Sequence, residues 1–231
     1  VTFRGMCKGA GMIEPNMATM LGFIETNVDL PKTLLKKYLK QCADISFNSI
    51  SVDGDMSTND TVVFSSTGEL KLNMKNKSIE TKFLSFASNF FIRLSSLIVK
   101  DGEGATKFIK LNVINAKSLI LAQEVSKKIS SSILVKTAMF GEDPNWGRIV
   151  ASIGSIESCD IKPLNIKLMI NNILCFKNGI SLNSGSKRLE KSMRKSTIEI
   201  TVDLNHGKHK QSMYFSDLSY DYIRINSEYT T

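Results

Sequence analysis

The sequence predicts a mixed α/β (α+β) fold in which layered sheets are flanked by helices. Helix and strand signals alternate along the chain, which is typical of such folds. Between residues 79 and 99 apolar side chains recur every three or four positions, which predicts a long helix with one buried face: Phe83, Ala87, Phe90, Phe91, Leu94 and Ile98. The stretch TIEITVDL, at residues 197–204, instead alternates apolar and polar residues, as half-buried strands do.

A helix and two strands are predicted ahead of this long helix. Asp29 is a candidate N-cap, and Pro31 opens a short amphipathic helix whose apolar face holds Leu34, Leu35, Tyr38 and Leu39. The stretch FNSISVDGD predicts a strand that runs into a turn at Gly54, and TVVFSSTG predicts a second strand that ends at Gly68.

The remaining elements follow a tight glycine loop, KDGEGATK, at residues 100–107. They are a strand in FIKLNVI, a helix over residues 117–128, a strand in NIKLMINNILCF and the alternating strand described above; SMYFSDLSYDYIRI closes the chain. We place a domain boundary after the glycine loop, which divides the chain into residues 1–107 and residues 108–231.

Length and composition are those of an ordinary soluble globular protein. The chain has 231 residues, of which 42% are hydrophobic and 23% charged, enough for one large domain or two modest ones. No apolar run approaches the roughly 20 residues of a membrane span. The N-terminus lacks a signal-peptide core and does not begin with Met, so we expect the chain to start within a longer protein. The four cysteines form no CxxC pair, which favours a reducing, cytoplasmic setting.

The net charge of +8 raises the alternative of a basic binding module without catalysis. The lysines are dispersed, for example around residues 70–77 and 187–195, and no RNA-binding aromatic signature accompanies them. A lysine-rich solvated surface is therefore the favoured interpretation, without nucleic acid or membrane as a partner.

Three familiar kinds of site have little support in the sequence. His206 and His209 lie in a polar turn, DLNHGKH, where surface histidines are expected rather than a catalytic base or, together with Asp203, a metal site. The stretch DGDMSTND, at residues 53–60, lacks the glycine and glutamate positions of an EF-hand and is interpreted as a hydrogen-bonded turn. GEGATK lacks the spacing of a phosphate-binding P-loop.

The irregular stretch GMIEPNMATML, at residues 11–21, offers another way to activate a hydroxyl. A threonine at a chain terminus carries its own base, because the α-amino group has a pKa of about 7.7–8.0 and can take the hydroxyl proton. An internal threonine reaches that state when its hydroxyl attacks the preceding carbonyl and water cleaves the resulting ester. The small Ala18 leaves its carbonyl accessible to Thr19, and Pro15 can hold a bent backbone. On these residues alone, a buried threonine in a turn is the simpler interpretation.

Longer segments resemble one known family. KGAGMIEPNMATML is similar to the self-cleavage segment of ornithine acetyltransferase, also called glutamate N-acetyltransferase, of arginine biosynthesis. SFNSISVDGDMSTNDTV, KDGEGATKFI, GEDPNWGRI and DLSYDYIRINSEYTT resemble further signatures of that family, in the same order. Together these segments extend over nearly the whole chain.

The resemblance implies a self-processing fold of the N-terminal-nucleophile type. The precursor would cut itself between Ala18 and Thr19, and the two pieces would stay associated, typically as an α2β2 assembly. Thr19 would take acetyl from N2-acetylornithine and pass it to glutamate, with acetyl-CoA as a second donor in some members. No cofactor or metal is implied. The first region would be catalytic, and the tail of the second would return to the active site.

By position in these segments, the resemblance implies five substrate-contacting residues: Lys8, Thr19, Glu103, Asn226 and Thr231. Their chemistry suits the substrates, since a lysine can meet a carboxylate, a glutamate can meet the ornithine ammonium and an asparagine can both donate and accept. Without the resemblance, all except Thr19 would be interpreted as surface or tail residues. DPNWGR, with Trp146 and Arg148, is expected to form a turn without a catalytic role.

Two departures from the family pattern bear on activity. The oxyanion-hole donors of the family, a Thr-Gly pair, lie ahead of the segment at which this sequence starts, and losing one such donor costs about 10²–10³ in rate. This stretch alone is therefore expected to be an incomplete enzyme. Glu14 stands where alanine is common, next to the expected cut. A related self-processing amidase or aminopeptidase, in which water accepts the acyl group, is the nearest alternative.

Overall fold

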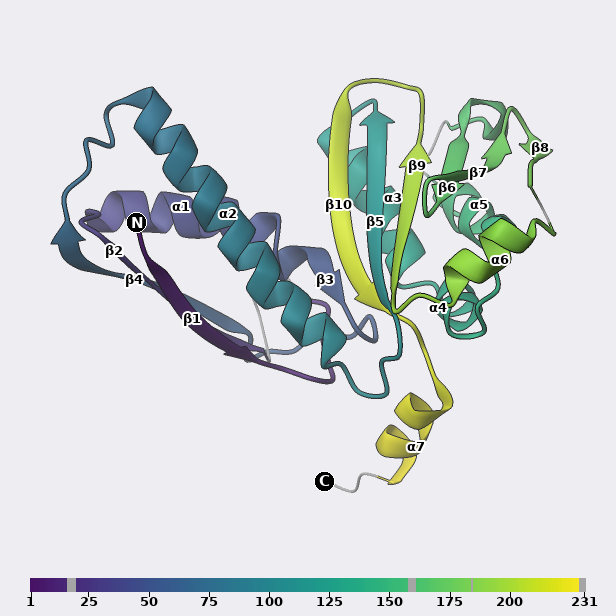
Figure 1. Ribbon diagram of the computed structural model, residues 1–231, viewed down its shortest axis with the longest axis horizontal. Coiled ribbons are helices and arrows are strands. Elements are labelled where there is room, and N and C mark those ends of the chain that lie inside the picture. Colours follow the sequence, from purple (N-terminus) through teal and green to yellow (C-terminus); the bar gives the residue numbers. More distant parts are fainter. Residues whose placement is uncertain (16–19, 158–160, 184, 229–231) are drawn as a thin grey trace.

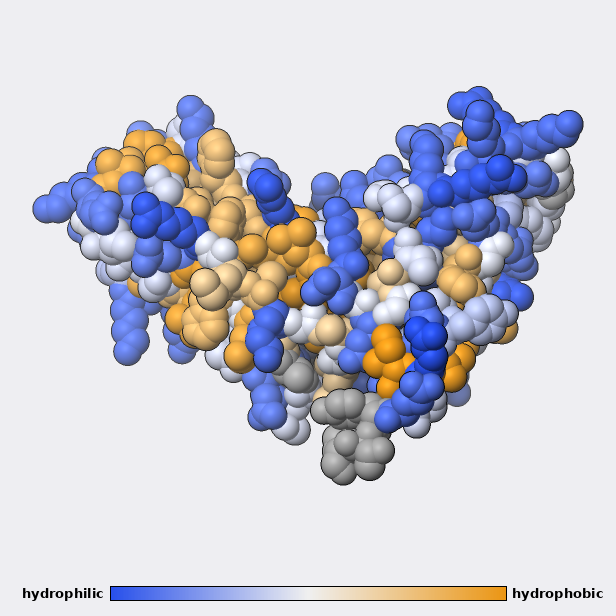
Figure 2. Space-filling model, turned by 60° about the horizontal axis from the view of Figure 1, so that its bottom comes forward, coloured by the Kyte–Doolittle hydropathy of each residue, from blue (hydrophilic) through white to orange (hydrophobic). Residues whose placement is uncertain are grey.

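The computed structural model describes residues 1–15, 20–157, 161–183 and 185–228. These residues form two sheets, each covered by helices, which confirms the predicted α/β class. The sheets lie in two lobes; the long helix α2 (Lys77–Lys100) runs across the first lobe towards the second, and α7 (Tyr220–Glu228) lies at the bottom of the view (Figure 1). Figure 2 shows the same two lobes in space-filling form, with apolar side chains gathered on the lobe that contains α2.

The first lobe is built on a three-stranded sheet within the described residues, in the order β1-β2-β4. Strand β2 (Leu21–Val28) pairs antiparallel with β1 (Phe3–Lys8) and parallel with β4 (Thr61–Leu70). In the register of β1 and β2, Lys8 lies opposite Leu21. The end of β1 and the start of β2 therefore flank residues 9–20, the segment that carries the expected cut.

Helices α1 (Lys32–Asp44) and α2 cover this sheet, and the buried face of α2 is the one that its spacing predicts. Its residues Phe83 and Phe91 are almost fully buried, and each such ring stabilises the fold by about 1.5–3 kcal/mol relative to its exposed state. By length and composition α2 could cross a membrane, and no other helix among the described residues could. In this fold it packs on β1 and reaches β3 (Ile50–Ser51) and β10 (His209–Ser216) of the second sheet.

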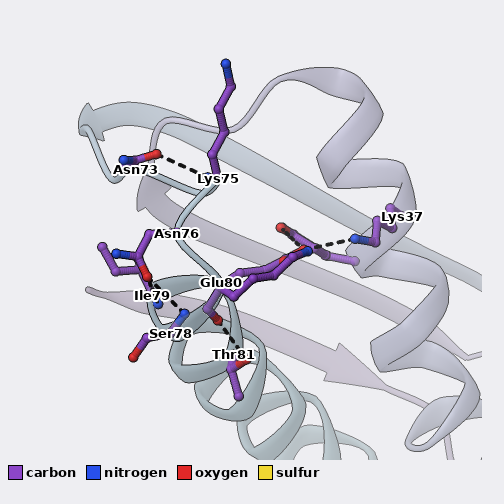
Figure 3. A network of polar contacts seen from close by, with 10 residues as sticks. Lys37, Asn73, Lys75, Asn76, Ser78, Ile79, Glu80 and Thr81 are labelled. Atoms are coloured by element: carbon purple, nitrogen blue, oxygen red, sulfur yellow. Dashed lines mark hydrogen bonds and ion pairs between the residues drawn. The ribbon is translucent and has the colours of Figure 1, made fainter.

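The N-terminus of α2 is held by a polar network around Glu80 (Figure 3). Asn76 caps the helix, its side chain accepting from the backbone N–H of Ser78 at 3.0 Å. The Glu80 carboxylate accepts from Lys37 at 2.9 Å and from Tyr38 at 3.1 Å, both on α1. It also pairs with an exposed lysine one turn earlier on α2. These hydrogen bonds lower the pKa of Glu80 to about 2, and the two helices are thereby joined through one carboxylate.

We expect this network to contribute stability in a defined pH range. Because the pKa of Glu80 is about 2 in the folded protein against an ordinary 4.5, its contribution is present above pH 4.5 and is lost as the pH falls towards 2. The melting temperature of Glu80→Gln should therefore lie below that of the wild type at pH 6, and the difference should shrink between pH 4.5 and 2. Glu69→Gln, at an exposed site on β4, is the control. A difference that does not change with pH would contradict the assignment.

The second lobe contains a seven-stranded sheet within the described residues, in the order β3-β10-β5-β9-β6-β7-β8. The bounds of its later strands are β5 (Phe108–Ala116), β6 (Lys167–Ile170), β7 (Ile173–Lys177), β8 (Ile180–Ser181) and β9 (Thr197–Asp203). The bounds of its helices are α3 (Leu119–Ser130), α4 (Ile133–Phe140), α5 (Trp146–Gly154) and α6 (Lys187–Met193). Short 3₁₀ turns occupy Phe47–Ser49 and Pro163–Asn165. Helix α3 packs on β5 and β10.

Some local predictions are wrong. The stretch NIKLMINNILCF is a hairpin of β6 and β7 rather than one strand, because Asn171 and Asn172 both take left-handed backbone angles, φ 49° and 62°. The first helix has Pro31 rather than Asp29 at its N-cap, since the Pro31 carbonyl is the first to accept helical hydrogen bonds, from the Leu34 and Leu35 N–H groups at 2.9 and 3.0 Å.

The expected strand in FNSISVDGD and the expected turn in DPNWGR also differ from the structure. The first begins as a 3₁₀ turn and keeps only the two residues of β3 as a strand. The second runs into helix α5, whose N-terminus Asn145 caps by accepting from the Arg148 N–H at 3.2 Å. Trp146 then stacks on Phe176 with 4.9 Å between ring centroids, so the motif packs a helix against the hairpin.

The division at residues 107 and 108 stays a proposal. One apolar cluster lies almost wholly within residues 13–99 and the other within residues 109–215, which supports it. However, β3 pairs with β10 across this boundary, and Tyr214 packs in the first cluster. We propose two domains that share a sheet edge.

Candidate functional site

Two of the expected substrate residues, Glu103 and Asn226, are in contact. Glu103 lies in the glycine loop between α2 and β5, and Asn226 lies in α7. The Asn226 side-chain amide donates to the Glu103 carboxylate at 2.9 Å, across 123 residues of sequence. The loop is also tied to the residue just before α7, because the Ser219 hydroxyl donates to the Gly104 carbonyl at 2.6 Å. Gly104 has a φ of +65°, and a Cβ there would lie 2.4 Å from the Tyr222 nitrogen, so only glycine fits.

The Glu103 carboxylate lies directly against the segment that precedes the expected cut. The Glu103 N–H donates to the Ala10 carbonyl at 2.9 Å. A Cβ on Gly11 would lie 2.6 Å from a carboxylate oxygen of Glu103, closer than any real contact. A glycine at residue 11 therefore lets the backbone approach this side chain.

The turn at residues 53–60 grips the same segment ahead of the expected cut. The Asp53 carboxylate accepts from the backbone N–H groups of Met12 and Ile13, at 2.7 and 2.9 Å. The Val52 N–H donates to the Ile13 carbonyl at 2.7 Å. These bonds hold residues 12 and 13 beside the start of the turn, so the polar stretch is a clamp on this backbone rather than a cation site.

The end of the same turn hydrogen-bonds to the backbone that follows the expected cut. The Asp60 carboxylate accepts from the Met20 N–H at 2.6 Å, and the Thr61 N–H donates to the Met20 carbonyl at 2.9 Å. Asp60 and Met20 are 7% and 0% exposed. One loop therefore fixes both flanks of residues 16–19.

Negative charge gathers between the clamp and α7. Burial, together with the neighbouring carboxylates of Asp53, Asp55 and Glu103, raises the pKa of Tyr222 to about 12. A tyrosine with such a pKa stays neutral throughout the physiological range. The surrounding carboxylates create a potential that favours a cationic ligand.

Of the other three expected residues, the structure describes Lys8 but not Thr19 or Thr231. Lys8, at the end of β1, is exposed and lines a groove of about 480 Å³ between β1 and α2. Neither Glu103 nor Asn226 lines that groove. Thr19 and Thr231 lie outside the described residues, so their roles rest on the flanking geometry and on the resemblance.

A buried lysine interacts electrostatically with the carboxylates of Asp53 and Glu14. Lys136, on α4, is 2% exposed and donates to the Ser216 carbonyl. Burial lowers its pKa to about 8, while Asp217, Asp53 and Glu14 oppose that effect. The lysine thus supplies positive charge beneath the carboxylates that hold the segment.

Glu14, the departure from the family pattern, is buried and fully engaged. Its carboxylate accepts from the hydroxyls of Ser51 at 2.9 Å and Ser131 at 2.7 Å, and it pairs with Lys127 at 3.0 Å. These partners lie on β3 and at the end of α3. Glu14 therefore ties the segment before the expected cut to the second lobe.

We expect Glu14→Ala to lower the free energy of unfolding by about 1–3 kcal/mol, because it strands the buried Ser51 hydroxyl and removes the ion pair. Glu14→Gln, which keeps an acceptor for both serines, should cost less. Urea unfolding of the two variants measures both effects. Equal losses in the two would contradict a hydrogen-bonding role.

The histidines lie away from this site, in and after the β9–β10 loop, and both are partly exposed. Asp203 accepts there from the Asn115 side chain at 2.9 Å, so its carboxylate is already used. No cluster of three His, Cys, Asp or Glu side chains placed to hold a metal occurs in the part of the chain that the structure describes.

Asp53, Asp60 and Tyr222 were not predicted as site residues. The first two were assigned to a polar turn, and aspartates that hold backbone N–H groups have the same local signature as turn aspartates. Only the folded chain shows that these two aspartates, seven residues apart in one loop, bond to the backbone on either side of residues 16–19. Tyr222 carried no signal beyond its place in a terminal motif.

Comparisons with known proteins identify a family that the chain matches along its whole length. The ArgJ family model matches residues 1–231. The arginine biosynthesis bifunctional protein ArgJ of Geobacter sulfurreducens is 40% identical over 233 residues, covering 100% of this chain and 59% of that protein. The glutamate N-acetyltransferase of Methanocaldococcus jannaschii is 44% identical over 239 residues, covering 98% of this chain and 58% of that protein.

A solved structure also matches. The crystal structure of the arginine biosynthesis bifunctional protein ArgJ from Bacillus halodurans superimposes with a TM-score of 0.85 at 33% identity, covering 91% of this chain and 100% of that chain. The present chain thus spans about three-fifths of the curated relatives it matches. The family model, the relatives and the shared fold together show that the chain belongs to the ArgJ family.

Proposed function

We propose that this chain carries the nucleophile and part of the substrate site of a glutamate N-acetyltransferase in arginine biosynthesis. The protein cuts itself before Thr19 and transfers acetyl from N2-acetylornithine to glutamate. The observation that carries the proposal is the convergence of three distant segments on residues 10–20. The loop at residues 53–60 and the Glu103 loop hydrogen-bond to the backbone of this segment, and α7 hydrogen-bonds to Glu103 through Asn226.

The chemistry proceeds in two transfers through one hydroxyl. The neutral α-amine of Thr19 takes the hydroxyl proton as the oxygen attacks the acetyl carbonyl of N2-acetylornithine. The carbon–nitrogen bond breaks, the proton passes to the leaving amine, and ornithine departs from an acetyl-threonine ester. The amine of glutamate then attacks the ester and regenerates the hydroxyl. No residue other than the terminal threonine has to supply the base.

The described residues fit the charges of these substrates. Glu103, oriented by Asn226, faces the ammonium of the ornithine side chain, in the negative potential beside Tyr222. Lys8 is exposed at the end of β1, and its ammonium meets a substrate carboxylate. The resemblance implies that Thr231 is a further substrate-contacting residue.

We further propose that the two pieces stay together as a cytoplasmic α2β2 assembly, with the oxyanion hole supplied by the part that precedes this chain.

The experiment is acetyl transfer by the purified full-length protein. Intact mass should show a chain that begins TMLGFIET and that gains one acetyl group on incubation with N2-acetylornithine alone. Initial rates with varied acetylornithine and glutamate should give the parallel lines of ping-pong kinetics. Rapid hydrolysis of acetylornithine that glutamate does not divert would favour the amidase instead. Replacing acetylornithine by acetyl-CoA in the same assay determines whether a second donor is used.

A further inference from the structure

Helix α7, which carries Asn226, is not held in place by a buried face. It lies below both lobes in Figure 1, and none of its residues, Tyr220–Glu228, is buried. A helix in a globular protein usually gains most of its stability by packing an apolar face on the core. Because α7 buries no such face, the position of Asn226 depends on specific contacts at the start of the helix and along it.

One buried hydroxyl joins the start of α7 to the glycine loop. Ser219 is 4% exposed, and its hydroxyl donates to the Gly104 carbonyl at 2.6 Å and accepts from the Tyr222 N–H at 3.3 Å. The first bond crosses 115 residues of sequence, and the second caps the first turn of the helix. A single oxygen therefore holds the loop that carries Glu103 against the helix that carries Asn226.

The two backbones approach each other closely at this point. A Cβ added to Gly104 would lie 2.4 Å from the Tyr222 nitrogen and 2.7 Å from the Ser219 hydroxyl oxygen. Asn226 lies about 10 Å further along the helix than Ser219, at 1.5 Å per residue. A tilt of about 5° at the start of α7 would therefore move the Asn226 amide by about 0.9 Å, more than the spread of N–H···O distances allows.

The ring contact at the start of α7 does not reach the glycine loop. Tyr220 meets Phe140 of α4 edge to face, with 5.4 Å between ring centroids, and Tyr220 itself is 79% exposed. This contact ties the helix to the second lobe. The hydroxyl of Ser219 is instead the contact that relates the start of α7 to the loop that carries Glu103.

Resting on the proposed function, we propose that Ser219 is a positioning residue for the side-chain ammonium of ornithine. Its hydroxyl holds the glycine loop and α7 at the separation at which the Asn226 amide donates to the Glu103 carboxylate at 2.9 Å. The ammonium is remote from the acetyl group that reacts, so contact with it is equally strong in the ground state and the transition state. Loss of such a contact raises KM and leaves kcat unchanged.

The test is the affinity of the purified full-length protein for L-ornithine, measured by calorimetry, together with initial rates of acetyl transfer. We expect Ser219→Ala to raise the Kd for ornithine and the KM for N2-acetylornithine at least about tenfold, with kcat within about threefold of the wild type. Ser219→Thr keeps the hydroxyl and should restore both constants to within about threefold. Unchanged constants in Ser219→Ala, or no recovery in Ser219→Thr, would overturn the proposal.

A control on the same helix separates this role from general stability of α7. The Ser227 hydroxyl donates to the Arg224 carbonyl within α7, so Ser227→Ala removes a hydroxyl without touching the loop. It should leave the Kd for ornithine and the KM for N2-acetylornithine unchanged. An equal loss of affinity in Ser227→Ala and Ser219→Ala would assign the effect to the helix as a whole and contradict the role of Ser219.

A double-mutant cycle determines whether Ser219 acts through Glu103. In a Glu103→Gln background, Ser219→Ala should weaken ornithine binding by less than about twofold, because the charge that it positions is already absent. A tenfold loss in both backgrounds would exclude this route. Should Ser219→Ala fold poorly, Ser219→Cys fills a similar volume with a weaker donor and should raise the Kd at least about threefold; a wild-type Kd in that variant would count against the proposal.

The binding measurement keeps this proposal separate from the proposed function. A wild type that binds ornithine but transfers no acetyl contradicts the proposed function, and the Kd values of the variants still decide the role of Ser219. A wild type that transfers acetyl, with an unchanged Kd in Ser219→Ala, contradicts Ser219 alone. A wild type that does not bind ornithine contradicts both.

Discussion

Thr19→Ala in the full-length protein is expected to leave a single uncut chain and to abolish acetyl transfer. The substitution removes the one hydroxyl that the proposal uses both to cut the chain and to carry acetyl. Removing the nucleophile of a hydrolase lowers kcat by about 10⁴–10⁶-fold, and a similar loss is expected here. The intact mass of the purified protein and its initial transfer rate measure the two consequences separately.

Thr19→Ser is the matched control, because it keeps the hydroxyl and removes only a methyl group. It should still be cut and should retain transfer at a reduced rate. A Thr19→Ala protein that is cut at the same bond, or one that still acquires an acetyl group from N2-acetylornithine, would exclude Thr19 as the nucleophile.

Asp217→Ala is expected to lower the free energy of unfolding by about 3–5 kcal/mol and to weaken substrate binding. The Asp217 carboxylate is 3% exposed and accepts from the backbone N–H groups of Thr106 and Lys107, each at 2.8 Å. Its charge also counteracts the lowering of the Lys136 pKa that burial causes. Truncation would leave the buried Lys107 N–H without its acceptor, remove the bond to the Thr106 N–H and leave Lys136 with less counter-charge. The same bonds fix the end of the loop that carries Glu103, so KM for acetylornithine should rise.

Asp217→Asn provides the comparison for this residue. It keeps the volume and one acceptor oxygen, so we expect a smaller loss, about 1–3 kcal/mol, in urea unfolding. Equal stability of Asp217→Ala and the wild type would show that the loop is held by other contacts. An unchanged KM in a destabilised variant would confine Asp217 to a structural role.

Local patterns predicted the longer helices, α1, α2 and α3, and missed the shorter ones. The face of α2 follows from its three- and four-residue spacing, and its observed bounds lie within two residues of the prediction. Helices α4, α5 and α6 have nine residues or fewer, too few for their spacing to stand out. The β6–β7 hairpin depends on two asparagines that adopt left-handed angles, which an apolar run conceals.

The sequence by itself determined the family, the order of the motifs and the likeness of residues 8–21 to a self-cleavage segment, because these depend on residue identity along the chain. Only the tertiary structure decided that residues 53–60 grip both sides of that segment, that Glu103 meets Asn226, and that Glu14 is neutralised by Lys127. Each of these contacts joins residues 40 or more positions apart. Local propensity carries no information on such distances, so packing of the two sheets around α2 had to bring the partners together.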